Sequence, residues 1–486
     1  MRILLAASEM VPFSKTGGLA DVAGALTKAL SRLGHEVIAV TPLYKSVKEK
    51  GFAIEDIDCP FGVPISNREE YGEIFRATLD NGVTVYFIGK AAYYDREQLY
   101  RTQQGDYPDN AERFIFFSKA VLELCKVLKI NPDVIHCNDW QTGLVPLYLH
   151  TLQSREPVFQ NTATVFTIHN IGYQGLFWHL DMHLTNLPWD LFMPDGIEFY
   201  GKINLLKAGI IGADILNTVS PRYAREIQTP EFGAGLEGIL RKRSDRLFGV
   251  LNGVDYDEWN PESDKYLVAN YGPADLSGKA QCKRDLAEQF GLPVSDHMPV
   301  IGVVSRLDNQ KGFDILAPVM DDIVEQGYQF VLLGTGDKEY HALFEKLAKK
   351  HAKRVGVKLL FSNELAHKVE AGADIFLMPS RYEPCGLNQM YSLKYGTVPL
   401  VRATGGLDDT VVDYAASPAN GNGFKFEEYS STALLAKLAE ARKFYENPEE
   451  WNRIIQNGMA CDFSWDASAG RYEELYQKAL SLSANR

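Results

Sequence analysis

This sequence lacks a long apolar run. A membrane-spanning helix needs about 20 consecutive apolar residues, and no such stretch occurs here. A secretory leader needs a longer apolar core than residues 3–7, which Glu9 soon follows. We therefore expect a soluble, cytoplasmic protein with no membrane partner.

Paired cysteines and an excess of basic residues are also missing. The six cysteines lie at positions 59, 125, 137, 282, 385 and 461 and include no C-x-x-C pair, so neither a disulfide framework nor a zinc site is visible. The formal net charge is −13, whereas nucleic-acid binding needs a basic face. We expect no nucleic-acid partner. A neutral polymer such as a glucan fits without electrostatic conflict, and a few local cations could still bind a small anion.

Metal and dinucleotide signatures are weak. The loop after the first apolar run has neither G-x-G-x-x-G nor Walker spacing, which argues against a nicotinamide oxidoreductase. Asp255 and Asp257 have the spacing of a metal-and-diphosphate motif, but they lie in a predicted turn. His136, Cys137 and His169 form no spaced ligand set. We expect no metal and no cofactor.

What the sequence does contain is an alternation of apolar strand-like runs with amphipathic helices. This rhythm predicts an α/β fold of parallel sheets with helices on both faces. At 486 residues the chain exceeds one hydrophobic core, so two domains of roughly 200 residues each are expected. The predicted strands cover residues 3–7, 37–40, 134–137, 163–168 and 215–219, then 300–304, 329–333, 359–361, 374–378 and 398–401.

The domain boundary is predicted from turn signals. Residues 252–255 and 259–261 are rich in turn formers and separate the two series of strands. We therefore place one doubly wound, Rossmann-like domain at residues 1–248 and a second at residues 249–463. A last helix over residues 466–482 has no strand after it and could pack on either domain.

The first candidate site is the loop at residues 15–21 (KTGGLAD), between a predicted strand and a predicted helix. Ligands bind at the carboxyl ends of parallel strands, which is this position. Gly17 and Gly18 let the backbone approach a ligand, the helix start offers free N–H groups, and Lys15 adds a charge for a phosphate. The same residues also fit a tight turn with a solvated lysine.

The second candidate site is residues 383–388 (EPCGLN), after the predicted strand 374–378. The N–H groups near Gly386 would face a diphosphate, and Glu383 could hold sugar hydroxyls or stabilise oxocarbenium-like charge. A helix-capping glutamate is the alternative interpretation. Arg306 and Lys311 follow the strand 300–304 and suit phosphate binding, although such a pair is more often part of a solvated surface loop.

A third group of polar and aromatic residues lies in the first half. His169 ends the strand 163–168, and Asp139 follows the strand 134–137, so both belong to the same sheet edge. His169 could hydrogen-bond a sugar hydroxyl, although a lone histidine there is more often structural. Tyr93, Tyr94 and Tyr173 could cover the apolar face of a sugar, or they could be ordinary half-buried core residues.

Taken together, these segments resemble the bacterial glycogen synthases and plant starch synthases, which are retaining glucosyltransferases of the GT-B fold. The matching motifs are residues 15–22, 138–140, 169–170, Arg306 with Lys311, and 383–387, and the likeness covers almost the whole chain. The resemblance implies two facing Rossmann-like domains with a cleft between them, the acceptor on the first and the nucleotide on the second. It also implies that the C-terminal helix, residues 464–486, packs back on the first domain.

The resemblance implies roles for individual residues. It assigns catalytic roles to Glu383, His169, Arg306, Lys311 and Asp139. It assigns substrate binding to Lys15, Gly18, Asp21, Tyr94, Asn170, Tyr382, Gly386, Leu387 and Asn388. Position 391, where other retaining GT-B enzymes have the second Glu of an E-x7-E pattern, is Tyr391, a feature that the glycogen and starch synthases share.

The implied reaction transfers glucose from ADP-glucose to the non-reducing 4-hydroxyl of an α-1,4-glucan such as glycogen, with retention of the α configuration. The alternatives are a UDP-glucose-dependent retaining transferase and a non-catalytic glucan-binding protein of the same fold. A donor comparison separates the first alternative. The full charged set of Lys15, Arg306, Lys311 and Glu383 argues against the second, because a pure glucan binder has no use for it.

Overall fold

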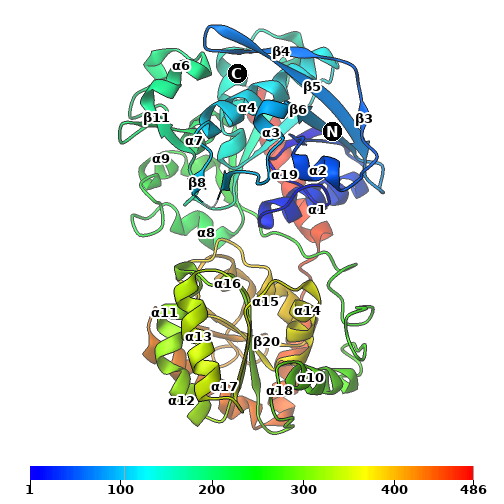
Figure 1. Cartoon of the computed structure of the whole chain (residues 1–486), viewed down its shortest axis with the longest axis vertical. Coiled ribbons are helices and arrows are strands. Elements are labelled where there is room, and N and C mark those ends of the chain that lie inside the picture. Colours follow the sequence, from blue (N-terminus) through cyan, green and yellow to red (C-terminus); the bar gives the residue numbers. More distant parts are fainter. Residues whose placement is uncertain (103, 485–486) are drawn as a thin grey trace. The chain divides into compact units, whose positions relative to one another are not determined.

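The chain forms two compact units in a computed structural model that describes residues 1–102 and 104–484 (Figure 1). The first unit contains residues 1–219, 224–253 and 465–486, and the second contains residues 220–223 and 254–464. In the described part of the chain, no helix combines the length and the apolar character needed to cross a bilayer. The six cysteines are all unpaired thiols.

The first unit is built on a ten-stranded sheet with a parallel centre. Leu4 on the central strand lies in register with Ile38 on one side and Ile135 on the other. Because helices cover both faces, the central strands are buried along almost their whole length. The strand order is β15 (Leu247–Gly249), β14 (Ile215–Thr218), β10 (Ala163–Ile168), β9 (Val134–Asn138), β1 (Arg2–Ala6), β2 (Glu36–Pro42), β6 (Thr84–Gly89), β5 (Arg68–Thr78) and β3 (Glu55–Asp56), with β4 (Phe61–Ile65) paired to β5.

The direction of winding reverses between β1 and β9. From β1 the chain passes through α1 (Gly18–Arg32) to β2 and onward to β6, whereas β9, β10, β14 and β15 follow one another on the other side. In open α/β sheets ligands bind beside the carboxyl ends of the strands at such a reversal. The loops that follow β1 and β9 therefore meet at the expected ligand position of this unit.

The C-terminal helix α19 (Trp465–Ser483) belongs to the first unit and lies beside α1 (Figure 1). Arg32 of α1 donates to Asp466 at 2.6 Å. The hydroxyl of Tyr476 lies 2.9 Å from Nδ1 of His136, which is fully buried in β9. Helix α19 thus closes one face of the first sheet with residues from the far end of the chain.

The second unit has a six-stranded sheet in which every pairing is parallel. Its winding reverses between β16 and β19, so the loops after these two strands occupy the equivalent ligand position. The order is β18 (Val355–Lys358), β17 (Gln329–Leu333), β16 (Val300–Val304), β19 (Ile375–Met378), β20 (Val398–Arg402) and β21 (Phe424–Phe426). The helices include α13 (Lys338–Lys350), α14 (Asn363–Gly372), α15 (Asn388–Lys394), α16 (Gly405–Thr410), α17 (Ser431–Tyr445) and α18 (Pro448–Met459).

One predicted strand is wrong. The apolar residues 359–361 were expected to form a strand, but the strand β18 ends at Lys358 and these residues lie in the loop before α14. Phe361 is 87% exposed, so the run is apolar without being buried. A run of three apolar residues does not show whether the segment is a short buried strand or an exposed loop, because the same residue types occur in both.

Candidate active site

The first glycine loop connects β1 to α1. The helix begins at Gly18, its N-cap Gly17 has an extended backbone (φ −153°), and no side chain caps the helix. Among the described residues, no hydrogen bond uses the backbone N–H of Gly18 or Leu19. Lys15 and Asp21 form an exposed ion pair with 2.7 Å between Nζ and Oδ1. This loop therefore offers an anion free N–H groups and a cation.

Glu9 shapes this loop from beneath, and sequence reasoning missed it. Its buried carboxylate accepts hydrogen bonds from the backbone N–H of Thr16 and, at 3.3 Å, of Gly17, and from Thr16 Oγ1 at 2.9 Å. Burial raises the pKa of Glu9, and these hydrogen bonds offset only part of that shift. The available signal was an acidic residue three positions after a buried strand.

Asp139, directly after β9, has a strained backbone. Its φ of 55° and ψ of −178° lie in a region that is essentially reserved for glycine, at a cost of about 1–3 kcal/mol. The buried carboxylate accepts the backbone N–H of His169 at 2.8 Å. Burial raises the pKa of Asp139 to about 7, although hydrogen bonds from the His169 and Asn170 backbone lower it. Such strain beside a switch point is typical of a functional position.

His169 follows β10 and is joined to the same cluster. Asn138 donates its amide to the Ala6 carbonyl at 3.1 Å, so its oxygen faces the His169 ring, 2.9 Å from Nε2. Desolvation lowers the pKa of His169 to about 3, so the ring is neutral near pH 7. A neutral ring that donates through Nε2 keeps Nδ1 as an acceptor for a ligand hydroxyl.

The other residues expected in the first unit differ in accessibility. Asn170 is partly exposed, and its oxygen accepts the Gly172 N–H at 2.9 Å. Tyr94 is fully buried, and its hydroxyl donates to the Arg113 carbonyl at 3.0 Å. A ring that covers a sugar needs a free face. Tyr173, which is 57% exposed, has the accessibility that Tyr94 lacks.

In the second unit the loops after β16 and β19 are joined by a charge pair. Lys311 Nζ lies 2.7 Å from Glu383 Oε2, and the hydroxyl of Ser380 donates to the same oxygen at 3.1 Å. The side chains of Lys311 and Glu383 are only 19% and 8% exposed. A partly desolvated, hydrogen-bonded pair of this kind is held in one geometry. Arg306, on the same loop as Lys311, is far more exposed and lies 3.6 Å from Asp308.

The chain after Glu383 turns into the start of α15. Gly386 has a φ of 71°, a conformation that favours glycine. The side-chain amide of Asn388 donates to the Val304 carbonyl at 2.9 Å, which ties the helix start to the end of β16. Within the described chain, the backbone N–H groups of Gly386, Leu387 and Asn388 donate no hydrogen bond. Tyr382 is partly exposed, and its carbonyl accepts the Gln310 side chain at 3.2 Å.

Phe361 is a second residue that sequence reasoning missed. It lies in the loop after β18, at the same carboxyl edge of the sheet as Lys311 and Glu383. The Phe361 side chain is 87% exposed, so its ring face is accessible to a ligand. An exposed ring face at the same sheet edge as these charged loops is suited to stacking on a nucleobase.

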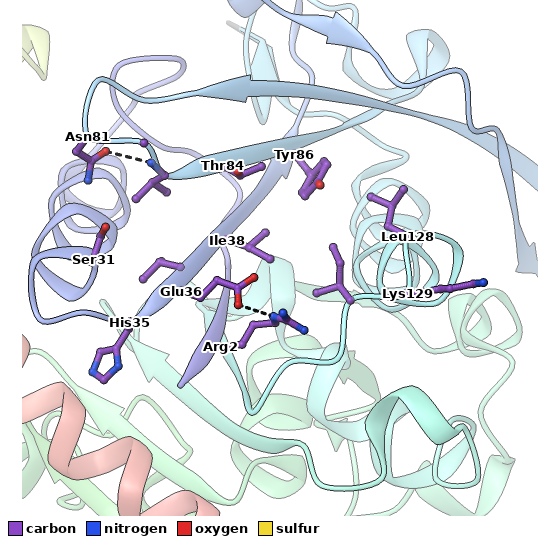
Figure 2. A pocket seen from close by; sticks show the side chains of 14 residues that line it. Arg2, Ser31, His35, Glu36, Ile38, Asn81, Thr84, Tyr86, Leu128 and Lys129 are labelled. Atoms are coloured by element: carbon purple, nitrogen blue, oxygen red, sulfur yellow. Dashed lines mark hydrogen bonds and ion pairs between the residues drawn. The ribbon is translucent and has the colours of Figure 1, made fainter.

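A hollow of ≈ 420 Å³ lies at the other edge of the first sheet (Figure 2). Arg2 and Glu36, which begin β1 and β2, face each other at 2.9 Å in it. The hollow lies at the amino ends of these strands, so it is at the opposite edge of the sheet from the loops that follow the carboxyl ends. Within the described residues, no three His, Cys, Asp or Glu side chains gather in a metal-binding group.

Comparisons with known proteins show which families and relatives this chain resembles. Residues 2–242 match the family described as the starch synthase catalytic domain, and residues 287–460 match glycosyl transferases group 1. The glycogen synthase of Koribacter versatilis is 50% identical over all of this chain and 99% of its own length. That of Thermosipho melanesiensis is 47% identical over 99% of each chain.

Solved structures agree. The catalytic domain of Starch Synthase IV from Arabidopsis thaliana, bound to ADP and acarbose, superposes with a TM-score of 0.89 at 34% identity over 99% of both chains. Sucrose-phosphate synthase from Thermosynechococcus elongatus, with a TM-score of 0.59 at 19% identity, shares the fold.

The two doubly wound sheets and their switch-point loops thus define a glycosyltransferase of the GT-B fold. More particularly, the chain belongs to the family of the bacterial glycogen synthases and plant starch synthases. The resemblance, the fold class and the retaining glucosyltransferase activity expected from the sequence motifs are confirmed.

Proposed function

We propose that this protein transfers glucose from ADP-glucose to the non-reducing 4-hydroxyl of an α-1,4-glucan such as glycogen, with retention of configuration. The observation that carries the proposal is the Lys311–Glu383 pair at the switch point of the second unit, beside the free N–H groups at the start of α15. The ADP bound by the related starch synthase supports the choice of donor.

The second unit would hold the nucleotide end of the donor. Arg306 and Lys311 would neutralise the diphosphate, and the N–H groups of residues 386–388 would hydrogen-bond to it. The exposed ring of Phe361 would stack on the base, with Tyr382 close to the nucleotide. Because negative charge grows on the diphosphate as the glycosidic bond breaks, these fixed donors stabilise the transition state more than the ground state.

In the second unit, Glu383 would meet the sugar end of the donor; in the first unit, His169 would bind a sugar hydroxyl. The carboxylate of Glu383 would stabilise positive charge on the glucosyl ring, and Lys311 keeps this carboxylate in place. The neutral ring of His169 would accept a sugar hydroxyl at Nδ1. Lys15 and Gly18 would contact the donor, and Asp21, Asp139 and Asn170 the donor or the acceptor.

Retention would follow because the acceptor hydroxyl attacks the same face of the sugar from which the leaving group departs. The glucosyl–oxygen bond breaks to give a short-lived ion pair, and the acceptor oxygen then bonds to the anomeric carbon. The departing phosphate oxygen takes the proton of the acceptor hydroxyl, so no separate general base is needed. This assignment agrees with Glu383 being engaged by Lys311 and Ser380 rather than placed as a free base.

The experiment that tests the proposal is incorporation of glucose into glycogen by the purified protein. ADP-glucose and UDP-glucose are compared side by side in the presence of EDTA. Incorporation from ADP-glucose alone is the expected result and would also show metal independence. Preference for UDP-glucose would keep the mechanism but replace the donor. No incorporation from either donor would contradict the proposal and favour a non-catalytic glucan binder. The cytoplasmic location expected from the sequence stays a prediction.

A further inference from the structure

Three aromatic rings are stacked in the second unit, and none of them has a role in the function proposed above. Trp259 lies in the turn-rich segment before β16, and its indole is sandwiched between His367 of α14 and Tyr391 of α15. The ring centroids lie 3.8 Å and 3.9 Å from that of Trp259, with interplanar angles of 9° and 1°. Trp259 thus bridges two helices that are adjacent to the candidate site.

A buried carboxylate anchors this stack. Asp264, only 5% exposed, accepts hydrogen bonds from His367 Nδ1 at 2.7 Å and from the Tyr395 hydroxyl at 2.6 Å. Burial acts to raise the pKa of Asp264, but the hydrogen bonds from His367 and Tyr395 outweigh it and lower that pKa. The irregular segment that carries Trp259 and Asp264 is therefore held firmly against both helices.

The contacts on α15 lie along one face of the helix. Asn388 and Tyr391 of α15 and Tyr395, the residue directly after the helix, are spaced i, i+3 and i+7, which places them on the same side. Asn388 bonds to the end of β16, Tyr391 stacks on Trp259, and Tyr395 bonds to Asp264. These three contacts are among those that hold the seven-residue α15, whose Ser392 also donates to Glu370.

The chain between β19 and α15 carries Glu383. Any tilt of α15 would move this chain, and with it the Lys311–Glu383 pair. Displacements of about 1 Å in a reacting geometry can cost roughly a hundredfold in rate. The stack is therefore placed to control the donor site although it lies outside it.

We propose that Trp259 is a positioning residue for the nucleotide-sugar donor, acting through its stack on Tyr391 to hold α15 and the Glu383 loop in place. The inference rests on the proposed function, because it assigns a support to the same donor site. It explains why a tryptophan stands in a turn-rich segment that has no strand or helix of its own.

The test compares three substitutions of Trp259. Trp259→Phe keeps a planar ring for Tyr391, whereas Trp259→Leu keeps apolar bulk without a ring face and Trp259→Ala removes both. We expect Leu and Ala to raise the Kd for ADP and the KM for ADP-glucose by about tenfold, with the KM for glycogen unchanged. Phe should restore most of the donor affinity. The Phe and Leu pair keeps the test valid if the Ala variant does not fold.

Two controls separate positioning from general stability. Trp451 of α18, which is more deeply buried than Trp259, packs against Tyr445 and Phe424. Trp451→Leu should lower the Tm without changing the Kd for ADP. In a Tyr391→Ala background, Trp259→Leu should have no further effect on that Kd, because its route to the donor is already absent.

The outcomes are distinct from those of the proposed function. If the wild-type protein neither binds ADP nor uses ADP-glucose, the proposed function fails and this inference fails with it. If the wild-type protein does both but Trp259→Leu lowers only the Tm, the positioning role is refuted and the function stands. Equal donor affinity in the Phe and Leu variants would also refute it.

Discussion

The first candidate ligand loop and the start of α16, which packs against the second candidate loop, use glycine for opposite reasons. In the first unit, a Cβ added at Gly17 or Gly18 would meet no atom within 4 Å. In the second unit, a Cβ at Gly405 would lie 1.9 Å from the Glu383 carbonyl oxygen, and one at Gly406 would lie 2.1 Å from that of Cys385. The fold therefore requires the second pair, whereas the first pair leaves open space that a ligand can enter.

The charge pairs in the two units differ in the same way. The Lys15 and Asp21 side chains are 52% and 35% exposed, and a pair of this kind contributes at most about 1 kcal/mol to stability. Lys311 and Glu383 are largely enclosed, and the Ser380 hydroxyl donates a further hydrogen bond to Glu383. The first unit thus offers groups that a ligand must organise, and the second offers groups that are already organised. The predictions below test this contrast.

The largest effect is expected at Glu383. Glu383→Ala should reduce kcat by roughly 10²–10³-fold, because a fixed charge at the reacting sugar is lost. The Tm should fall modestly, since Lys311 keeps some access to water. Turnover with ADP-glucose and thermal unfolding are measured together. Glu383→Gln keeps the Ser380 hydrogen bond but not the charge and should be nearly as inactive; near-normal turnover in either variant would remove the assigned role.

One matched pair of substitutions tests whether the glycines of the two units differ in this way. Gly406→Ala should destabilise the protein by about 1–3 kcal/mol, because the new methyl group collides with backbone. Gly18→Ala should leave the free energy of unfolding unchanged and weaken donor use instead. Denaturant unfolding and the KM for ADP-glucose separate the two. Loss of stability in Gly18→Ala, without a change in KM, would show that both glycines serve the fold.

A smaller effect is expected at Lys15. Lys15→Ala should raise the KM for ADP-glucose by about tenfold, the cost of one charge-assisted hydrogen bond of about 1.5 kcal/mol. Stability should be almost unchanged because the Lys15–Asp21 pair is exposed. Steady-state kinetics at two salt concentrations measure this, since salt screens an exposed charge. Unchanged donor kinetics would place Lys15 outside the site.

The last prediction concerns stability rather than turnover and is a pH dependence at Asp139. Its pKa is about 7 in the folded protein and about 3.9 when unfolded, so the folded state holds a proton that the unfolded state has lost. The stability contributed by this group is complete below pH 4 and is lost as the pH rises to 7. Asp139→Asn cannot ionise, so its Tm should gain a few degrees on wild type across this window. A constant Tm difference between pH 4 and 7 would contradict the assignment.

Much of the framework was predictable from local pattern. The strands β10, β16 and β17 were predicted with the bounds that the structure has, because long apolar runs of branched residues have few alternatives. The loops carrying Lys15, Asp139 and Glu383 were predicted because they follow such strands. The run 359–361 was misread because three apolar residues carry no periodicity. The burial of Tyr94 was not predictable, because a tyrosine looks the same in a core and in a sugar site.

The sequence by itself determined the α/β rhythm, the residue types at each strand end and the family, since these depend on neighbouring residues and on motifs. Tertiary structure decided which strand ends lie together. Lys311 and Glu383 are separated by 72 positions and meet only because β16 and β19 are adjacent at a switch point. The strain at Asp139 and the burial of Glu9 also exist only after the sheet has formed. Sheet order, burial and backbone strain arise from contacts distant in the chain, and no local pattern encodes them.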